Sequence, residues 1–354
     1  MPDTLFSRII GRRQCLRALL GAGVLGWIGL APRANATPDI VADAAPGRST
    51  PQATGNSTVV IVKTDDRAKG IRAAMARFDL SRFQGGRVAL KANYNSADPF
   101  PASTHPDTLR TMIETLAETR PASMTLIERS GMGDTAQVLR SLGVRSLAEG
   151  LGVEVVVMDD LGADGYVSFQ PAGSQWKRGF LLARHFAEAD AVVQTCCLKT
   201  HQYGGHFTMA LKNVVGAVAK HDPGDGYNYM TELHRSPLQR SLIAEISLAF
   251  RNDLIIMDGM KAFITGGPHA GREVSPGVIV AGTDPVAVDA VGVAILRMYP
   301  TTDAVKTGPV FAQEQIRRAV ELGIGARSPE AIELVPIGPG ADEFGSRVRE
   351  ILMA

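Results

Sequence analysis

Residues 190–201 read Asp-Ala-Val-Val-Gln-Thr-Cys-Cys-Leu-Lys-Thr-His. Over 190–198 the run is rich in apolar and β-branched residues and lacks the period of an amphipathic helix, which predicts a strand buried on both faces. Strands of this kind belong to parallel sheets. Lys199, Thr200 and His201 then fall at the carboxyl end of the strand, where doubly wound sheets have their ligand crevice.

Short β-rich runs alternate with helical patterns on both sides of this stretch. The other predicted strands are 59–63, 87–91, 124–128, 154–159, 254–258, 277–281 and 332–336. The predicted helices are 66–78, 106–119, 134–142, 208–218, 237–250, 284–298 and 311–322. This alternation predicts an α/β fold with a doubly wound, mainly parallel sheet. A length of 354 residues also leaves room for a second, smaller α/β lobe.

The amino-terminal segment has the features of a twin-arginine export signal. Arg12 and Arg13 precede a Gly-rich apolar run over 18–31, and Ala34-Asn35-Ala36 matches a small-residue cleavage pattern. The run is shorter than the roughly 18 residues needed to span a bilayer. We therefore expect residues 1–36 to be a signal peptide, read by the twin-arginine translocase and cleaved after Ala36. The mature protein is expected in the periplasm without a stable membrane anchor.

The composition of the remaining chain predicts three segments: a linker, a folded domain and a C-terminal tail. Residues 37–56 are rich in Pro, Ala, Gly, Ser and Thr and have no apolar period, which predicts a flexible linker. Residues 57–340 are expected to form the α/β domain, and residues 341–354 a C-terminal tail.

Charge and cysteine content exclude several classes of protein. The chain has 37 basic and 36 acidic side chains, and removal of residues 1–36 leaves 32 and 35. A chain with this balance is not expected to bind nucleic acid or an anionic membrane surface. Cys196 and Cys197 remain after signal removal. Because adjacent cysteines form a disulfide only with strain, no disulfide framework is expected.

Histidines and lysines gather between residues 196 and 234, which hold four of the seven histidines and three lysines. This cluster predicts a site for a small-molecule ligand. Lys199 and His201 are expected to face the ligand from the end of the strand.

Lys212 lies in the predicted helix 208–218, where it shares one face with Thr208 and Gly216. Apolar neighbours such as Leu211 would partly desolvate its ammonium group. A desolvated lysine has a lowered pKa and can act as nucleophile, covalent tether or proton carrier. The alternative is a surface lysine whose stem covers an amphipathic helix.

The histidines of the cluster could also bind a metal ion. Their spacing is wider than in compact motifs such as H-E-x-x-H, so folding would have to gather them. His201 and His234 are the predicted ligands, and nickel, zinc or iron the predicted metal, while the cofactor itself stays open. Gly204, Gly205 and Asn213 are predicted cofactor contacts in the same stretch.

A second set of predicted site residues lies outside this cluster. Lys91 and His105 flank a polar loop whose other polar residues are explained by helix capping. Asp258 ends the predicted strand 254–258, and Asp289 lies in the predicted helix 284–298. Either carboxylate could face the site, or could orient a loop or cap.

Residues 128–136 match the pattern G-x-G-x-x-A between a strand and a helix, with Gly131 and Gly133 as its glycines. Asp159 follows at about the distance of a ribose-binding acid, so the pattern predicts a dinucleotide site. A tight turn competes with this interpretation, because Glu128 would place negative charge beside a pyrophosphate.

These motifs together resemble the domain-of-unknown-function family numbered 362, from about residue 59 to residue 337. The resemblance is carried by residues 104–106, 128–133, 189–190, 198–201, 207–208, 211–213, 216, 258–259, 266–268, 271, 284–285 and 289. Many relatives carry ferredoxin-like cysteine runs. This chain has none, so no iron–sulfur cluster is expected.

A more distant likeness is to the lactate racemase family. There a lysine tethers a nickel pincer cofactor, and histidines bind the metal and transfer protons. The order of residues is matched here by His201, Gly204-Gly205, Lys212 and His234, at different spacings. The likeness implies a metal or acid–base site.

Three functions follow from the sequence. The favoured one is an exported, metal- or cofactor-dependent enzyme that performs proton transfer or isomerisation on a small anionic or carbonyl-containing substrate. His201 and Lys212 are its predicted central pair. His234 would bind metal or carry a proton, and Lys199 would hold substrate charge. The second is a dinucleotide-dependent oxidoreductase that uses the glycines of 131–133, and the third is a non-catalytic periplasmic protein that binds a metal or ligand.

Overall fold

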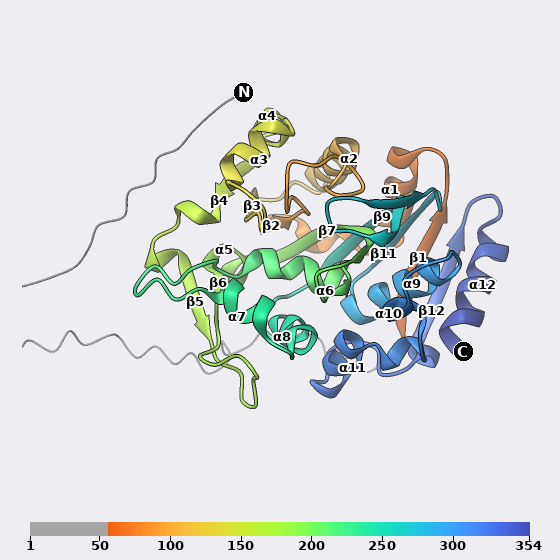
Figure 1. Ribbon diagram of the computed structural model, residues 1–354. Helices are drawn as coiled ribbons and strands as arrows, with labels where there is room; N and C mark the ends of the chain where they lie inside the picture. Colours follow the sequence, from red (N-terminus) through yellow and green to blue (C-terminus); the bar gives the residue numbers. More distant parts are fainter. Residues whose placement is uncertain (1–55) are drawn as a thin grey trace, which may run out of the picture. The chain divides into compact units, whose positions relative to one another are not determined.

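A large mixed sheet runs through the computed structural model, which describes residues 56–354 (Figure 1). Its main strand order is β12 (Ile332–Ile337), β1 (Ser57–Lys63), β11 (Val278–Gly282), β9 (Leu254–Gly266), β7 (Ala191–His201), β2 (Arg87–Lys91), β3 (Ser123–Glu128) and β4 (Glu154–Val157). Neighbours pair in parallel, except that β11 is antiparallel to both β1 and β9. Two short strands pair antiparallel with longer ones: β8 (His206–Phe207) with β7, and β10 (Gly271–Val274) with β9. The predicted α/β fold with a mainly parallel sheet is confirmed.

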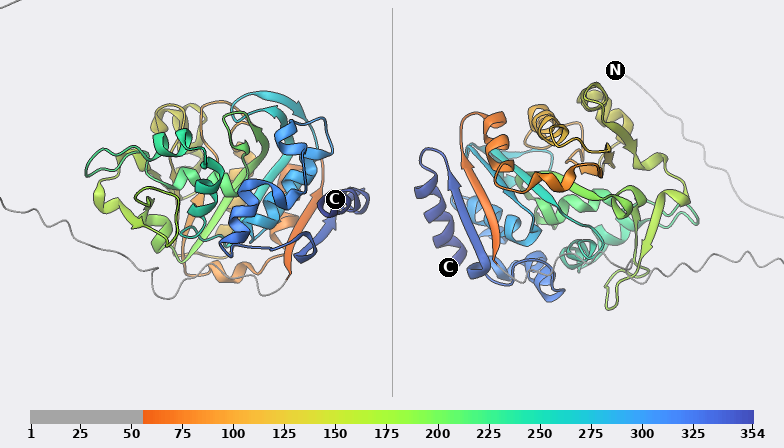
Figure 2. Two further views of the ribbon diagram at one scale, coloured as in Figure 1. Left: turned by 60° about the horizontal axis from the view of Figure 1, so that its bottom comes forward. Right: turned by 180° about the vertical axis from the view of Figure 1, so that it is seen from behind.

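Helices cover both faces of the sheet, as Figure 2 shows from two further sides. Alternate residues of β1 belong to different cores: Val60 and Val62 to one, Val59 and Ile61 to the other. The first face carries α1 (Arg67–Met75), α2 (Pro106–Ala117), α3 (Thr135–Ser141) and α4 (Val144–Gly150). The second carries α5 (Arg184–Glu188), α6 (Ala210–Asn213), α7 (Tyr229–Arg235), α8 (Gln239–Ile246), α9 (Pro285–Arg297), α10 (Asp303–Lys306), α11 (Glu314–Glu321) and α12 (Ala341–Met353).

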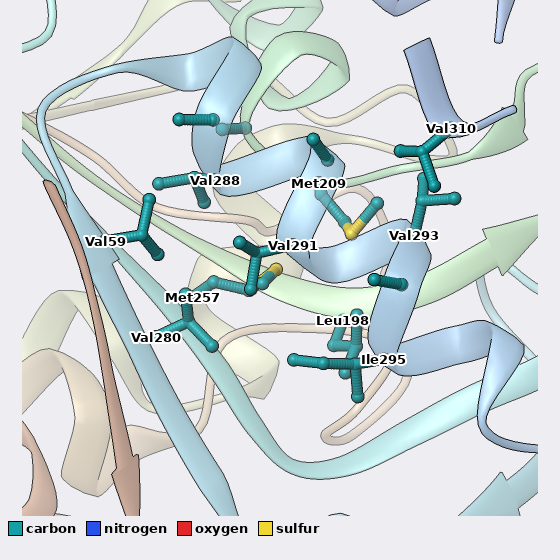
Figure 3. Packing of buried hydrophobic residues seen from close by; sticks show 14 of the residues in the cluster. Val59, Leu198, Met209, Met257, Val280, Val288, Val291, Val293, Ile295 and Val310 are labelled. Carbon is teal, nitrogen blue, oxygen red and sulfur yellow. The ribbon is translucent and has the colours of Figure 1, made fainter. Parts of the chain in front are cut away.

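Helix α9 forms the centre of one core on the second face. Asp284 caps it by accepting hydrogen bonds from two backbone N–H groups of its first turn (2.8 and 3.2 Å), and Pro285 occupies the first helical position. Val288 and Val291 lie in the same buried cluster as Met209, which directly precedes α6 (Figure 3). This packing holds α6 in place.

Some segments differ from the expectation. The predicted helix 208–218 is shortened to α6 and continues as a 3₁₀ helix, Val214–Ala217, because β-branched valines and a glycine are poor helix formers. The predicted strand 254–258 continues to Gly266 and pairs with β10. Residues 341–354, expected as a tail, form α12, whose apolar side chains join the core.

The predicted signal peptide 1–36 and all but the last residue of the predicted linker 37–56 lie outside the described residues.

A separate two-stranded antiparallel sheet consists of β5 (Tyr166–Phe169) and β6 (Phe180–Ala183). The domain boundaries and the second lobe stay predictions. Among residues 56–354, no helix is both long and apolar enough to cross a membrane.

Candidate functional site

A cavity of about 460 Å³ lies at the carboxyl ends of β2, β3 and β7. These strands are parallel neighbours, so the residues at their ends meet at one edge of the sheet. Lys91 ends β2, Arg129 follows β3, and His201 ends β7. Residues of α6 and α7 complete the wall. The ligand crevice predicted at the end of residues 190–201 is therefore present in the structure.

The wall of the cavity is rich in positive charge. Its lysine and arginine side chains are Lys91, Arg129, Lys199, Lys212, Lys220 and Arg235. None of the described residues that line it is an aspartate or a glutamate. Because burial strengthens the attraction between opposite charges, such a wall favours an anionic ligand.

Three of these cations are held by other protein groups. Lys91 Nζ lies 2.7 Å from Glu128 Oε2, and both side chains are buried. Arg129 donates to two backbone carbonyls in the segment after α6 (2.5 and 2.8 Å). Lys220 Nζ lies 3.6 Å from Asp159 Oδ1. These side chains shape the wall and are already engaged.

Lys199 is held by neutral partners. Its Nζ donates to Asn93 Oδ1 at 2.7 Å and to the carbonyl oxygen of Ala102, and burial lowers its pKa. Asn93 donates in turn to Asn213 Oδ1 at 3.1 Å, and Asn213 donates to Gln194 Oε1 at 2.9 Å. An ammonium group has three donors. In its protonated form Lys199 therefore has one N–H beyond these two bonds, in a position fixed by the amide network.

Lys212 projects from α6 into the cavity and is 8% exposed. Asp289 fixes the start of this short helix by accepting hydrogen bonds from its first two backbone N–H groups (2.7 and 3.1 Å). Burial, with added repulsion from Arg129 and Lys199, lowers the pKa of Lys212 to about 8. Its ammonium group makes no hydrogen bond and no ion pair with any other residue of the range 56–354.

His201 lies beside Lys212. Burial lowers the pKa of His201 to about 2, and the nearby Lys212 and Lys199 add to the effect. Its Nδ1 is buried and has no hydrogen-bond partner within residues 56–354. A Cβ atom at Gly205 would lie 2.9 Å from both His201 Nδ1 and Lys212 Cε, so only a glycine permits this approach without a shift.

His234 reaches the cavity from α7. Its Nδ1 lies 2.7 Å from the carbonyl oxygen of Met230. Because a carbonyl can only accept, Nδ1 carries the proton and Nε2 has a free lone pair. His234 is exposed to solvent on one side, and the partial burial of its ring lowers its pKa, with a contribution from the charge of Lys212. Both imidazoles are therefore neutral at pH 7, and His234, whose Nε2 lone pair is free, is the one placed to accept a proton.

The structure gathers most of the predicted site residues in one wall. Those that line the cavity are Lys91, Gly131, Lys199, His201, Lys212, Asn213 and His234. Gly205 lies against two of them. Gly133 and Gly204 are outside the lining, and their positive φ angles (103° and 80°) are those of tight turns.

Three further predicted site residues, all with polar side chains, lie outside this wall. His105 caps α2, with its Nδ1 accepting from Asp107 N at 3.1 Å. Asp258 accepts from Arg67 Nε at 2.8 Å and from a threonine of α2. Asp289 holds α6, as described above. Each therefore has a structural partner that accounts for its polar group.

The glycine pattern at 131–133 forms a tight turn. The backbone N–H of Gly131 donates to Asn95 Oδ1 at 3.1 Å, and a Cβ at residue 131 would lie 2.3 Å from the same oxygen. Asp159, the predicted ribose-binding acid, accepts from Thr135 Oγ1 and pairs with Lys220. These contacts explain the residues without a dinucleotide.

Arg129, Asn93 and Arg235 line the cavity but are absent from the predicted site residues. Arg129 and Asn93 follow strands that the sequence predicts. Their positions at the carboxyl ends of β2 and β3 are the signal that predicts both, as the end of β7 predicts Lys199 and His201. Arg235 lies on α7, which has no separate signal in the sequence, and was recognisable only as the neighbour of His234.

The residues present do not fit a metal ion held by side chains alone. In the part of the chain that the structure describes, no three His, Cys, Asp or Glu side chains are placed to bind one ion. The predicted ligands His201 and His234 are accompanied in the cavity by ammonium and guanidinium groups, which repel a cation. The predicted metal site is therefore not supported.

Fold and cavity define an α/β protein with a cation-rich pocket at the ends of its parallel strands. The chain belongs to the family described as domain of unknown function (DUF362), whose model matches residues 88–294. The predicted family is confirmed. No curated protein matches the chain. A solved structure, the lactate racemase apoprotein from Thermoanaerobacterium thermosaccharolyticum, is weakly similar, with 14% identity and a TM-score of 0.40 over 63% of this chain and 54% of that one.

Proposed function

We propose that the chain is an enzyme that binds a small carboxylate in this cavity and transfers a proton at the carbon next to a carbonyl group of that molecule. One observation carries the proposal: an unpaired lysine and two neutral imidazoles share a cavity whose described lining has no carboxylate. A cationic wall binds the anion, and a neutral imidazole, His234, remains to take its proton.

The roles follow from the hydrogen bonds. His234 is the general base, because its Nδ1–H is fixed on Met230 and its Nε2 is free. The remaining N–H of Lys199, together with Arg235, binds the substrate carboxylate. Lys212 supplies positive charge at the carbonyl group, which takes up the electron pair as the proton leaves.

Return of a proton to a different face or atom gives racemisation or isomerisation, and return of a solvent-derived proton to the same position gives exchange with solvent. Neither outcome requires an electron acceptor. The step therefore balances without an oxidant or reductant.

Exchange with solvent tests this proposal. The protein is incubated in D₂O with pyruvate, 2-oxobutyrate or 2-oxoglutarate, and loss of the C3 proton signal is followed by proton NMR. We expect exchange above the buffer rate, and a loss of at least about a hundredfold in His234→Gln, the size expected for removing a general base. His185→Gln is the matched control, because His185 lies on α5 and does not line this cavity.

A non-catalytic binding protein is the alternative outcome of the same experiment. Binding of the carboxylates without any exchange would support that function and contradict proton transfer. Export to the periplasm by the twin-arginine route is part of the proposed function, and is carried by Arg12 and Arg13.

A further inference from the structure

We propose that Lys212 captures the substrate covalently, as an imine with the carbonyl carbon of a 2-oxo carboxylate. This inference rests on the proposed function and deepens it, because it names the substrate class and gives the lysine a bond-forming role.

Lys212 differs from the other lysines of the wall in what its amine contacts. Lys91 is paired with Glu128, Lys220 lies near Asp159, and Lys199 donates to an amide and a backbone carbonyl. Among the described lysines that line the cavity, Lys212 has an amine without such a partner. Its nitrogen is therefore free to approach an electrophile.

The surroundings also favour the neutral amine. Burial and the nearby Arg129 and Lys199 lower the pKa of Lys212 to about 8. At pH 7 about one molecule in ten would then carry a free amine, against fewer than about one in a thousand for an ordinary lysine. The unprotonated nitrogen is the nucleophile in imine formation.

The reaction balances in atoms and charge. The Lys212 nitrogen attacks the carbonyl carbon, and a proton moves from nitrogen to the former carbonyl oxygen, giving a carbinolamine. The C–O bond then breaks and water leaves, with one further proton taken from solvent, to give a protonated imine. His201, a neutral imidazole beside Lys212, can hydrogen-bond with the amine and hold it in place during these steps.

The imine makes the proposed proton transfer easier. The positively charged C=N group accepts the electron pair left when His234 Nε2 removes a proton from the neighbouring carbon, and a neutral enamine forms. Protonation of the enamine and addition of water reverse the sequence and release the oxo acid. No oxidant or reductant is consumed.

Reductive trapping tests the inference. The full chain is incubated with pyruvate, 2-oxobutyrate or 2-oxoglutarate and sodium cyanoborohydride, then examined by intact mass and peptide mapping. We expect one reduced adduct per chain, on Lys212. Lys212→Met and Lys212→Arg should give none while melting as cooperative folded proteins. Lys69→Ala is the matched control, because Lys69 is exposed on α1.

The outcomes separate this inference from the proposed function. Solvent exchange without a trapped adduct would overturn the imine and leave proton transfer standing. An adduct on Lys212 without exchange would support the imine and contradict proton transfer. Labelling spread over surface lysines, or unchanged labelling in Lys212→Met, would overturn the inference.

Discussion

His201 and Lys212 meet across residue 205: a Cβ atom there would lie 2.9 Å from His201 Nδ1 and 2.9 Å from Lys212 Cε. The glycine is what lets an imidazole from the end of β7 and a lysine from α6 share one side of the cavity. The site therefore depends on a position without a side chain.

Gly205→Ala should displace the pair and impair the site. We expect at least a tenfold loss of adduct formation, with a stability cost of about 1–3 kcal/mol, because overpacking is relieved partly by movement of the lysine. Denaturant unfolding and trapping are measured on the same samples. Gly150→Ala is the control, since a Cβ at residue 150 has no neighbour within 4 Å. Equal trapping by both variants would contradict the role of Gly205.

Lys212→Met should change how stability depends on pH. In the folded protein the pKa of Lys212 is lowered from 10.5 to about 8, so between these values the unfolded chain binds more protons. The Lys212 contribution to the free energy of unfolding therefore rises with pH across that window. Relative to Lys212→Met, the wild type should gain on the order of 3 kcal/mol between pH 7 and pH 10.5. A constant difference between the two would show that the lysine has an ordinary pKa.

Glu128→Gln should be strongly destabilising. It leaves the Lys91 ammonium buried without its anionic partner, which costs about 3–5 kcal/mol. The double variant Lys91→Met with Glu128→Gln should recover most of that loss. Glu114→Gln, which removes an exposed partner of Arg72, should cost less than about 1 kcal/mol. Urea unfolding of the four proteins tests the comparison, and a similar loss in both single variants would contradict it.

Changing Arg12 and Arg13 together to lysine should block export while keeping the charge. The twin-arginine route requires the arginine pair itself. Cell fractionation and immunoblotting should find unprocessed protein in the cytoplasm, against processed protein in the periplasm for the wild type. Processed variant protein in the periplasm would rule out this route.

The fold and the position of the cavity could be predicted because both follow from local patterns. A buried, β-branched run over 190–198 indicates a parallel strand, and the carboxyl ends of parallel strands meet at one edge. Lys199 and His201 are predicted in this way. Lys212 and His234 are predicted instead from the lysines and histidines that gather over residues 196–234, and Lys212 also from its position on a predicted helix.

Contacts between distant segments could not be predicted. The first turn of α6 is set by Asp289, 79 residues from Ala210 along the chain, and the sequence shows only a candidate carboxylate. The pattern at 131–133 resembles a dinucleotide motif because local spacing does not reveal that Asp159 is held by Lys220. Local patterns locate polar residues, and tertiary partners decide whether they stay free for a ligand.

Binding of a small carboxylate by the cations of the cavity wall can be measured by isothermal titration calorimetry. Pyruvate and its uncharged amide are titrated into the wild type, and pyruvate into Lys212→Met and Arg235→Gln. We expect pyruvate to bind at least about tenfold more tightly than the amide, a difference of about 1.4 kcal/mol, and each substitution to weaken binding of the acid. Equal affinity for acid and amide, or binding of pyruvate that survives both substitutions unchanged, would contradict it.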